Sequence, residues 1–212
     1  MTSAYQLGRK LPVPTGFRVL DIPCAKLLSA ARSYGVTAAV LLCAMQIKAI
    51  ADSRDNIRGR IRISVPVDLR RVFPLSSYRN SSLYFLVSVK AKETADFLQL
   101  QNAAYTNVSN AKLKVFDLLP LPLKKFVLSI GYTRFGENQF TATMTDIGVI
   151  RLEDELRPMV NDIFFVLGRQ KTKPVNIAAS TYGNSAKLVV TYDIECNDFI
   201  GALQRLTDDF IM

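Results

Sequence analysis

Residues 60–70 read Arg-Ile-Arg-Ile-Ser-Val-Pro-Val-Asp-Leu-Arg, and this stretch decides the fold class. Its apolar residues occupy alternate positions, which is the period-two pattern of a strand with one buried face: Ile61, Ile63, Val65, Val67 and Leu69. Pro66 has no backbone N–H to give to a sheet, so it indicates an edge, a bulge or a strand end. The sequence therefore predicts a β-strand over residues 60–69 that leads into a loop.

Helices are predicted on the N-terminal side of this strand. Residues 38–51 are strong helix formers that are apolar nearly all round, which is typical of a buried helix, and Thr37 is a suitable N-cap. A shorter helix is expected over residues 26–34, where Gly35 ends it. Residues 1–25 are punctuated by prolines and a glycine, and we expect an irregular or extended entry segment there.

On the C-terminal side, a second strand is predicted over 83–89, followed by helices over 92–114 and 123–130. Short β-rich runs then follow at 140–144, 147–152, 162–167, 175–181 and 187–192. Gly183-Asn184 indicates a hairpin between the last two runs. A closing helix over 199–210, capped by Asn197 or Asp198, carries an apolar stripe.

This order of elements predicts an α+β fold in which a mixed β-sheet packs on helices, as an α/β sandwich. The chain has 212 residues, of which 49% are hydrophobic and 21% charged, so it can bury a sizeable core. We expect one domain over residues 1–212.

The chain contains no histidine. This excludes any mechanism within the chain that uses imidazole as general base, proton shuttle or metal ligand. The three cysteines are far apart and form no Cys-x-x-Cys pair, so no metal site and no redox pair is predicted. A reduced cytoplasmic protein is the simplest interpretation, and no cofactor is expected to be covalently bound.

Positive charge is concentrated in the first third of the chain. Residues 1–73 hold 12 Lys and Arg against 4 Asp and Glu, a net charge of +8, while residues 74–212 have a net charge of +1. The densest cluster is Arg54, Arg58, Arg60 and Arg62. This face is either a solvated surface or a site for an anionic partner. The chain lacks nucleic-acid-binding motifs, so no nucleic-acid partner is expected. Its longest helical apolar stretch is too short to span a bilayer, so no membrane span is expected.

Two further segments contain candidate site residues. Asp68 and Arg70 follow the predicted strand, where they either lock the strand to its loop or contact substrate. Residues 141–148 read Thr-Ala-Thr-Met-Thr-Asp-Ile-Gly, which puts three threonines on one strand face. That face is either a solvent-facing ladder or the lining of a cleft whose hydroxyls donate to an oxyanion. Residues 153–155, an acidic triplet, are expected to form a solvated loop.

In this order and context, these segments resemble the chloramphenicol-acetyltransferase-like superfamily of CoA-dependent acyltransferases, which includes bacterial alcohol acetyltransferases and condensation domains. The matching motifs are Tyr34-Gly35-Val36-Thr37, Val65 to Arg70, Phe73-Pro74, Arg79-Asn80, Leu121-Pro122-Leu123-Lys124, Thr145-Asp146-Ile147-Gly148 and Ser180-Thr181-Tyr182. The likeness extends over nearly the whole chain but corresponds only to the C-terminal lobe of such proteins. Their His-His-x-x-x-Asp-Gly motif, which provides the general base, lies in the other lobe.

The resemblance implies roles for individual residues. Thr145 is the candidate oxyanion donor. The lining of a tunnel for acyl-CoA or an acyl carrier thioester would comprise Thr143, Thr145, Asp146 and Gly148. Arg58 and Arg60 would meet CoA phosphates. Asp68, Arg70 and Asn80 would be structural. The family usually has Asn at position 146, and an ionised Asp accepts hydrogen bonds but cannot donate them.

The resemblance therefore implies the C-terminal half of an enzyme that transfers an acyl group from a thioester to an alcohol or amine. We expect the chain to be inactive alone, to pair with an N-terminal lobe, and to self-associate when unpaired. The alternatives are a non-catalytic binding or assembly module, a degenerate acyltransferase remnant, and an anion or nucleic-acid binder that uses the basic first third.

Overall fold

The computed structural model describes residues 4–7, 16–54, 57, 59–68, 82–90, 120, 122–123, 140–168 and 175–209. Its centre is a mixed six-stranded sheet with the strand order β1-β6-β5-β4-β2-β3. The strands are β1 (Gly16–Pro23), β2 (Arg60–Asp68), β3 (Ser82–Lys90), β4 (Ala142–Val149), β5 (Val175–Tyr182) and β6 (Ser185–Tyr192). The predicted α+β class is confirmed.

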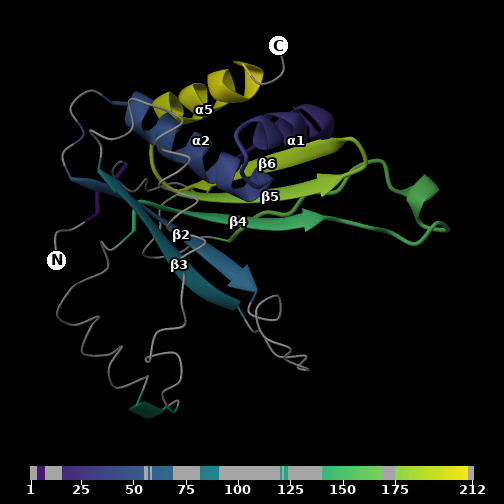
Figure 1. Cartoon of the computed structure of the whole chain (residues 1–212), viewed down its shortest axis with the longest axis horizontal. Helices are drawn as coiled ribbons and strands as arrows, with labels where there is room; N and C mark the ends of the chain where they lie inside the picture. The colour runs from purple at the N-terminus through teal and green to yellow at the C-terminus, as the bar shows by residue number, and fades with distance from the viewer. Residues whose placement is uncertain are drawn as a thin grey trace.

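Three helices cover one face of the sheet (Figure 1). They are α1 (Cys24–Ser33), α2 (Ala38–Asp52) and α5 (Asn197–Asp209). The Oγ1 of Thr37 accepts a hydrogen bond from the backbone N–H of Val40 at 3.3 Å, so Thr37 is the N-cap of α2 as predicted. α2 contacts both α5 and β2, while α1 contacts β1 and β6.

The hydrophobic core lies between these helices and the sheet. Alternate residues of each strand point into it: Leu20 and Ile22 from β1, Ile61 and Ile63 from β2, Val87 and Val89 from β3, Met144 from β4, Ile177 from β5, and Leu188 and Val190 from β6. The residues between them belong to the opposite side of the sheet, which none of the described helices covers and which we therefore call the helix-free face. Burial of apolar area on the helix side is the main force that stabilises the fold.

The predicted strand over 60–69 is confirmed as β2, and its pairing explains Pro66. β2 pairs with β3 along its whole length, from Arg60 opposite Lys90 to Asp68 opposite Ser82. Its parallel pairing with β4 is limited to two positions, Ile63–Ala142 and Ser64–Thr143. Beyond these positions the two strands separate. Pro66 therefore lies where β2 has no β4 neighbour to receive a backbone N–H.

The chain's strands differ from the sequence expectation in two places. Residues 16–23, within the entry expected to be irregular or extended, form the regular strand β1 in antiparallel register with β6 at one edge of the sheet. Gly16 and Pro23 are the end residues of this strand, and Pro23 is opposite Ser185. Residues 162–167 form no strand, although partly buried and exposed side chains alternate along them. Alternation alone does not supply a partner strand.

The remaining described strands and turns can be compared with the sequence predictions one by one. The β5–β6 hairpin turns at Gly183-Asn184, where Gly183 has φ +57°. The two runs predicted at 140–144 and 147–152 are one strand, β4, with an irregularity between Asp146 and Val149. The helix predicted over 92–114 and nearly all of the one predicted over 123–130 lie outside the described residues.

Within the described residues, no single helix is long and apolar enough to cross a membrane. α1 and α2 reach the required length and composition only when taken together, and they are bent by 88° at the break between them.

Candidate functional site

The two segments that carried the sequence motifs are neighbours in the centre of the sheet. β2 contains the Val-Pro-Val-Asp sequence and β4 contains the Thr-Met-Thr-Asp sequence, and both strands run in the same direction. They are paired at Ser64–Thr143 and separate after it, toward their carboxyl ends. In sheets with parallel strands, ligands typically bind where neighbouring strands diverge at their carboxyl ends.

Thr145 lies just beyond this point of separation. It is in register with Ala178 of β5, and it alternates with Met144, whose side chain is in the core, so Thr145 belongs to the helix-free face. Its side chain is partly buried. A hydroxyl in this position can donate one hydrogen bond to an oxygen atom placed above the helix-free face.

Asp146 and Gly148 form a local turn that shapes the end of β4. The backbone N–H of Gly148 donates to Oδ1 of Asp146 at 2.8 Å. Gly148 has φ +77°, and a Cβ added to it would meet no atom within 4 Å in the described part of the chain. Glycine is therefore favoured here by the backbone conformation and not by close packing. The turn produces the irregularity between Asp146 and Val149.

A row of buried polar side chains crosses the helix-free face next to Thr145, and sequence reasoning missed most of it. Strand register aligns Ser64, Thr143, Asn176 and Thr191 on β2, β4, β5 and β6. All four are at most 2% exposed. The hydroxyls of Thr143 and Thr191 have no hydrogen-bond partner among the described residues. Only the strand register brings these four residues together, so the missed signal was long-range.

The structure does not gather all of the predicted site residues. Asp68 ends β2, in register with Ser82. Arg60 begins β2, and its guanidinium donates to the side chain and backbone oxygens of Ser88 at 2.8 and 2.9 Å. Arg60 is therefore roughly 20 Å along the sheet from Thr145. Arg58, Arg70 and Asn80 lie outside the described residues.

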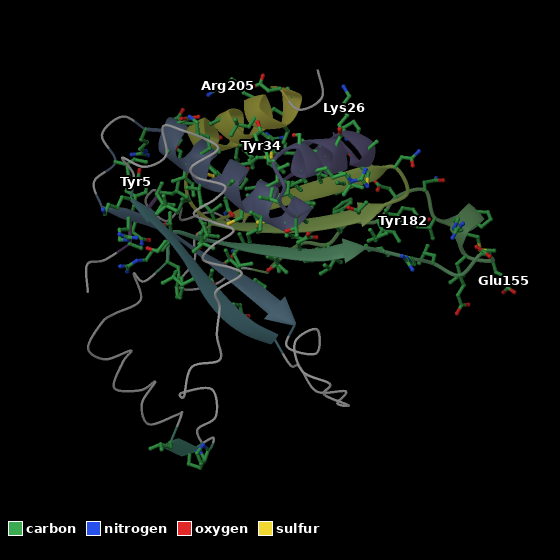
Figure 2. The ribbon with its side chains drawn as sticks, viewed as in Figure 1. Tyr5, Lys26, Tyr34, Glu155, Tyr182 and Arg205 are labelled. Atoms are coloured by element: carbon green, nitrogen blue, oxygen red, sulfur yellow. The ribbon has the colours of Figure 1, made fainter. Side chains whose placement is uncertain are left out.

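The two buried cysteines and the acidic triplet do not provide an obvious catalytic group. Burial raises the pKa of both the Cys43 and the Cys196 thiols to about 12, so both stay protonated near neutral pH and are poor nucleophiles. No group of three metal-ligating side chains occurs within the described residues. The acidic triplet at 153–155 is exposed, and Glu155 lies at the tip of a segment that projects beyond the sheet (Figure 2).

This projecting segment, residues 150–168, we call the arm. It leaves the end of β4, contains the short 3-10 helix η4 (Arg157–Met159), and returns toward β5 (Figure 1). Two contacts tie its returning half to the sheet. The hydroxyl of Tyr182 donates to the carbonyl of Val160 at 3.0 Å, and Nζ of Lys187 lies 2.8 Å from Oδ2 of Asp162.

Lys187 also pairs with Asp21 of β1, so one ammonium group joins β1, β6 and the arm. Hydrogen bonds to Asp162 and Asp21 raise the pKa of Lys187. Burial opposes ionisation of Asp21, but hydrogen bonds from Lys187 and Ser185 outweigh it and lower the pKa of Asp21. A surface cavity of about 430 Å³ lies beside this cluster, away from Thr145.

Comparison with known proteins gives a match in structure and none in sequence. No protein-family model and no curated protein sequence matches the chain. Among solved structures, a trichothecene 15-O-acetyltransferase from Fusarium sporotrichioides matches with a TM-score of 0.72 at 13% identity, over 98% of this chain and 49% of that one. A wax ester synthase/diacylglycerol acyltransferase from Marinobacter aquaeolei VT8 matches with a TM-score of 0.64 at 12% identity, over 97% and 50% of the two chains.

A chloramphenicol acetyltransferase matches with a TM-score of 0.54 at 11% identity, over 94% of this chain and 89% of that one. The fold is therefore that of chloramphenicol-acetyltransferase-like proteins, as the sequence motifs indicated. The chain spans about half the length of the first two matching proteins and 89% of the chloramphenicol acetyltransferase.

Proposed function

We propose that the chain is the C-terminal half of a CoA-dependent acyltransferase, which transfers an acyl group from acyl-CoA or a carrier thioester to an alcohol or amine. The observation that carries this proposal is the placement of the two motif strands. β2 and β4 are central, parallel neighbours that separate beside Thr145, in a fold that matches half of an acetyltransferase. Because the chain has no histidine, we assign the general base to a second lobe.

In this proposal Thr145 donates a hydrogen bond to the carbonyl oxygen of the thioester as it gains negative charge. Such a donor contributes when it is already oriented toward the developing oxyanion. Thr145 is held by the register of β4 with β5, and the Asp146–Gly148 turn fixes the strand end that follows it. The turn needs only an acceptor at position 146, and both Asp and Asn provide one. Asp at this position therefore keeps the local geometry.

The proposed partner lobe would contact a run of exposed apolar side chains that continues from β4 into the arm. These residues are 41–79% exposed: Ile147, Val149, Leu156, Met159, Phe164 and Val166. Exposed apolar side chains along one continuous segment are typical of an interaction surface. Among the described residues, no backbone–backbone hydrogen bond involves residues 163–168, and the N–H of Ile163 donates to Oδ1 of Asp162 at 2.9 Å. An irregular segment of this kind is one to which a partner can add a strand.

A non-catalytic binding or assembly module is the second candidate. The same apolar run favours it, since the run would serve an assembly role without any chemistry. The two candidates differ in their need for a thioester substrate. Coenzyme A binding supports the acyltransferase, whereas partner binding without coenzyme A binding supports the module.

The experiment is retention of the chain on immobilised coenzyme A, with release by free coenzyme A. We expect retention that free coenzyme A reverses, and no binding to duplex DNA at the same ionic strength. Lack of retention at low salt would contradict the proposal. DNA binding that weakens steeply with salt would instead support an anion or nucleic-acid binder that uses the basic first third.

A further inference from the structure

One buried amide contacts the strand on which the candidate site depends. The structure describes α2 in full, and ten of its residues are buried. Nine of the ten have apolar side chains, and the tenth is Gln46. Gln46 is 0% exposed. Its Nε2 donates to the backbone carbonyl of Thr143 on β4 at 3.4 Å.

The contact lies at the point where the sheet divides. Thr143 is the last residue of β4 that is in register with β2, and the described part of β4 beyond it pairs with β5 alone. Gln46 approaches from the helix side, whereas the Thr143 side chain belongs to the helix-free face. Gln46 therefore holds the β4 backbone without contacting the polar row on the other side.

The amide of Gln46 is only half satisfied. Its Oε1 is buried and has no hydrogen-bond donor among the described residues. A buried polar atom without a partner destabilises the folded state, and an apolar side chain of similar size avoids that penalty. Packing alone thus gives no reason for an amide here, and its specific contact is the one with β4.

We propose that Gln46 is a positioning residue for β4. Its carboxamide fixes where β4 leaves β2, and so determines where Thr145 and the Asp146–Gly148 turn lie. The structural part of this inference stands on the contact itself. Its consequence for substrate rests on the proposed function, because it assumes that Thr145 faces the thioester.

The test compares Gln46→Met with Ile47→Met. Both variants place an apolar methionine at a fully buried position of α2. The Ile47 side chain has no polar atom, so replacing it removes no side-chain hydrogen bond. Amide hydrogen exchange of residues 144–148 is measured by NMR, with amides of β5 and β6 as the internal reference, alongside urea unfolding. We expect Gln46→Met to speed exchange at 144–148 roughly five- to tenfold, with overall stability unchanged or raised. Ile47→Met should leave the exchange rate at 144–148, relative to the rates in β5 and β6, unchanged.

Exchange at 144–148 that stays as in the wild type, or that rises only in proportion to β5 and β6, would overturn the inference. If Gln46→Met does not fold, Gln46→Asn serves instead, because the shorter amide cannot reach Thr143 and should show the same local effect. Coenzyme A retention, measured on the same variants, separates the two proposals. If Gln46→Met speeds exchange at 144–148 but the wild-type chain does not bind coenzyme A, the positioning role of Gln46 is supported and the proposed acyltransferase function is contradicted.

Discussion

The backbone N–H of Gly148 donates to Oδ1 of Asp146 at 2.8 Å, which closes the end of the central strand β4. This bond gives the Asp at position 146 a structural role that an Asn oxygen would fill equally well. We therefore predict that Asp146→Ala lowers the free energy of unfolding by about 1 kcal/mol more than Asp146→Asn does, because only the alanine variant loses this acceptor. Urea unfolding of both variants checks this difference. Equal losses in the two variants would show that the charge, and not the acceptor, matters.

Gly148 and Gly201 should respond in opposite directions to alanine. Gly148 has φ +77°, so Gly148→Ala is expected to destabilise the fold by about 1–2 kcal/mol. Gly201 lies within α5, where the nearest atom to an added Cβ is 3.8 Å away on the Arg205 side chain. Gly201→Ala should stabilise by about 0.5–1 kcal/mol, because alanine favours a helix interior. Thermal unfolding of the pair distinguishes conformational strain from a general effect of added volume.

Lys187→Met should remove a pH-dependent part of the stability. The pKa of Asp21 is lowered in the fold, so its contribution is present above the ordinary value of 3.8 and is lost as pH falls through the lower folded value. The pKa of Lys187 is raised, so its contribution is present below 10.5 and is lost as pH rises through the higher folded value. The stability difference between wild type and variant should therefore be flat from about pH 4 to 10 and shrink outside that range.

The control for Lys187 is Lys48→Met. Lys48 pairs with Asp52 one helical turn away on α2, and no other element takes part. Exposed pairs of this kind contribute little. Urea unfolding across the pH range should show a larger effect for Lys187→Met than for Lys48→Met. A difference for Lys187→Met that is independent of pH would count against the ion cluster.

The isolated chain is predicted to have no acyltransferase activity, because no residue in it can act as an imidazole base. The measurement is thiol release from acetyl-CoA with and without an added alcohol. Release that the alcohol stimulates and that Thr145→Val abolishes would overturn this prediction. Thr181→Val on β5 is the matched control. By the alternation along β5, the Thr181 side chain belongs to the opposite face of the sheet from Thr145, so this change should not affect the oxyanion donor.

The unpaired chain is expected to self-associate through its exposed apolar run on β4 and the arm. Replacing Met159 and Phe164 by Ser should reduce this association, since these side chains are 79% and 41% exposed. Light scattering over a range of protein concentrations measures the effect. A wild-type chain that stays monomeric throughout would argue against the expectation.

Much of the fold could be predicted because it depends on local patterns. Alternating residues identified β2, an apolar helix with a Thr37 cap identified α2, and Gly183-Asn184 identified the β5–β6 hairpin. The strand expected over 162–167 does not form. Partly buried and exposed side chains alternate there, but a strand also needs a neighbouring strand to which its backbone can hydrogen-bond. β1 was not assigned as a strand because the prolines around it predicted only an irregular or extended entry, and its pairing with β6 lies far along the chain.

The candidate site shows the same division between local and long-range information. Thr145, Asp146 and Gly148 are close in sequence. Their pattern alone left a solvent-facing ladder and a cleft lining both open, and only the resemblance to acyltransferases implied a site there. Gln46 could not be identified from the sequence, because its contact with Thr143 spans 97 residues. The buried row across four strands needed the parallel register of β2, β4 and β5, which no single segment encodes.

The central claim is that this chain works as one lobe beside a second lobe that carries the catalytic histidine. Native mass spectrometry of the protein purified from its own source tests this most directly, with sequencing of every polypeptide in the measured species. We predict a species well above 23.6 kDa that contains a His-His-x-x-x-Asp-Gly motif, either in the same chain or in a bound partner. A species composed only of this histidine-free chain would contradict the claim.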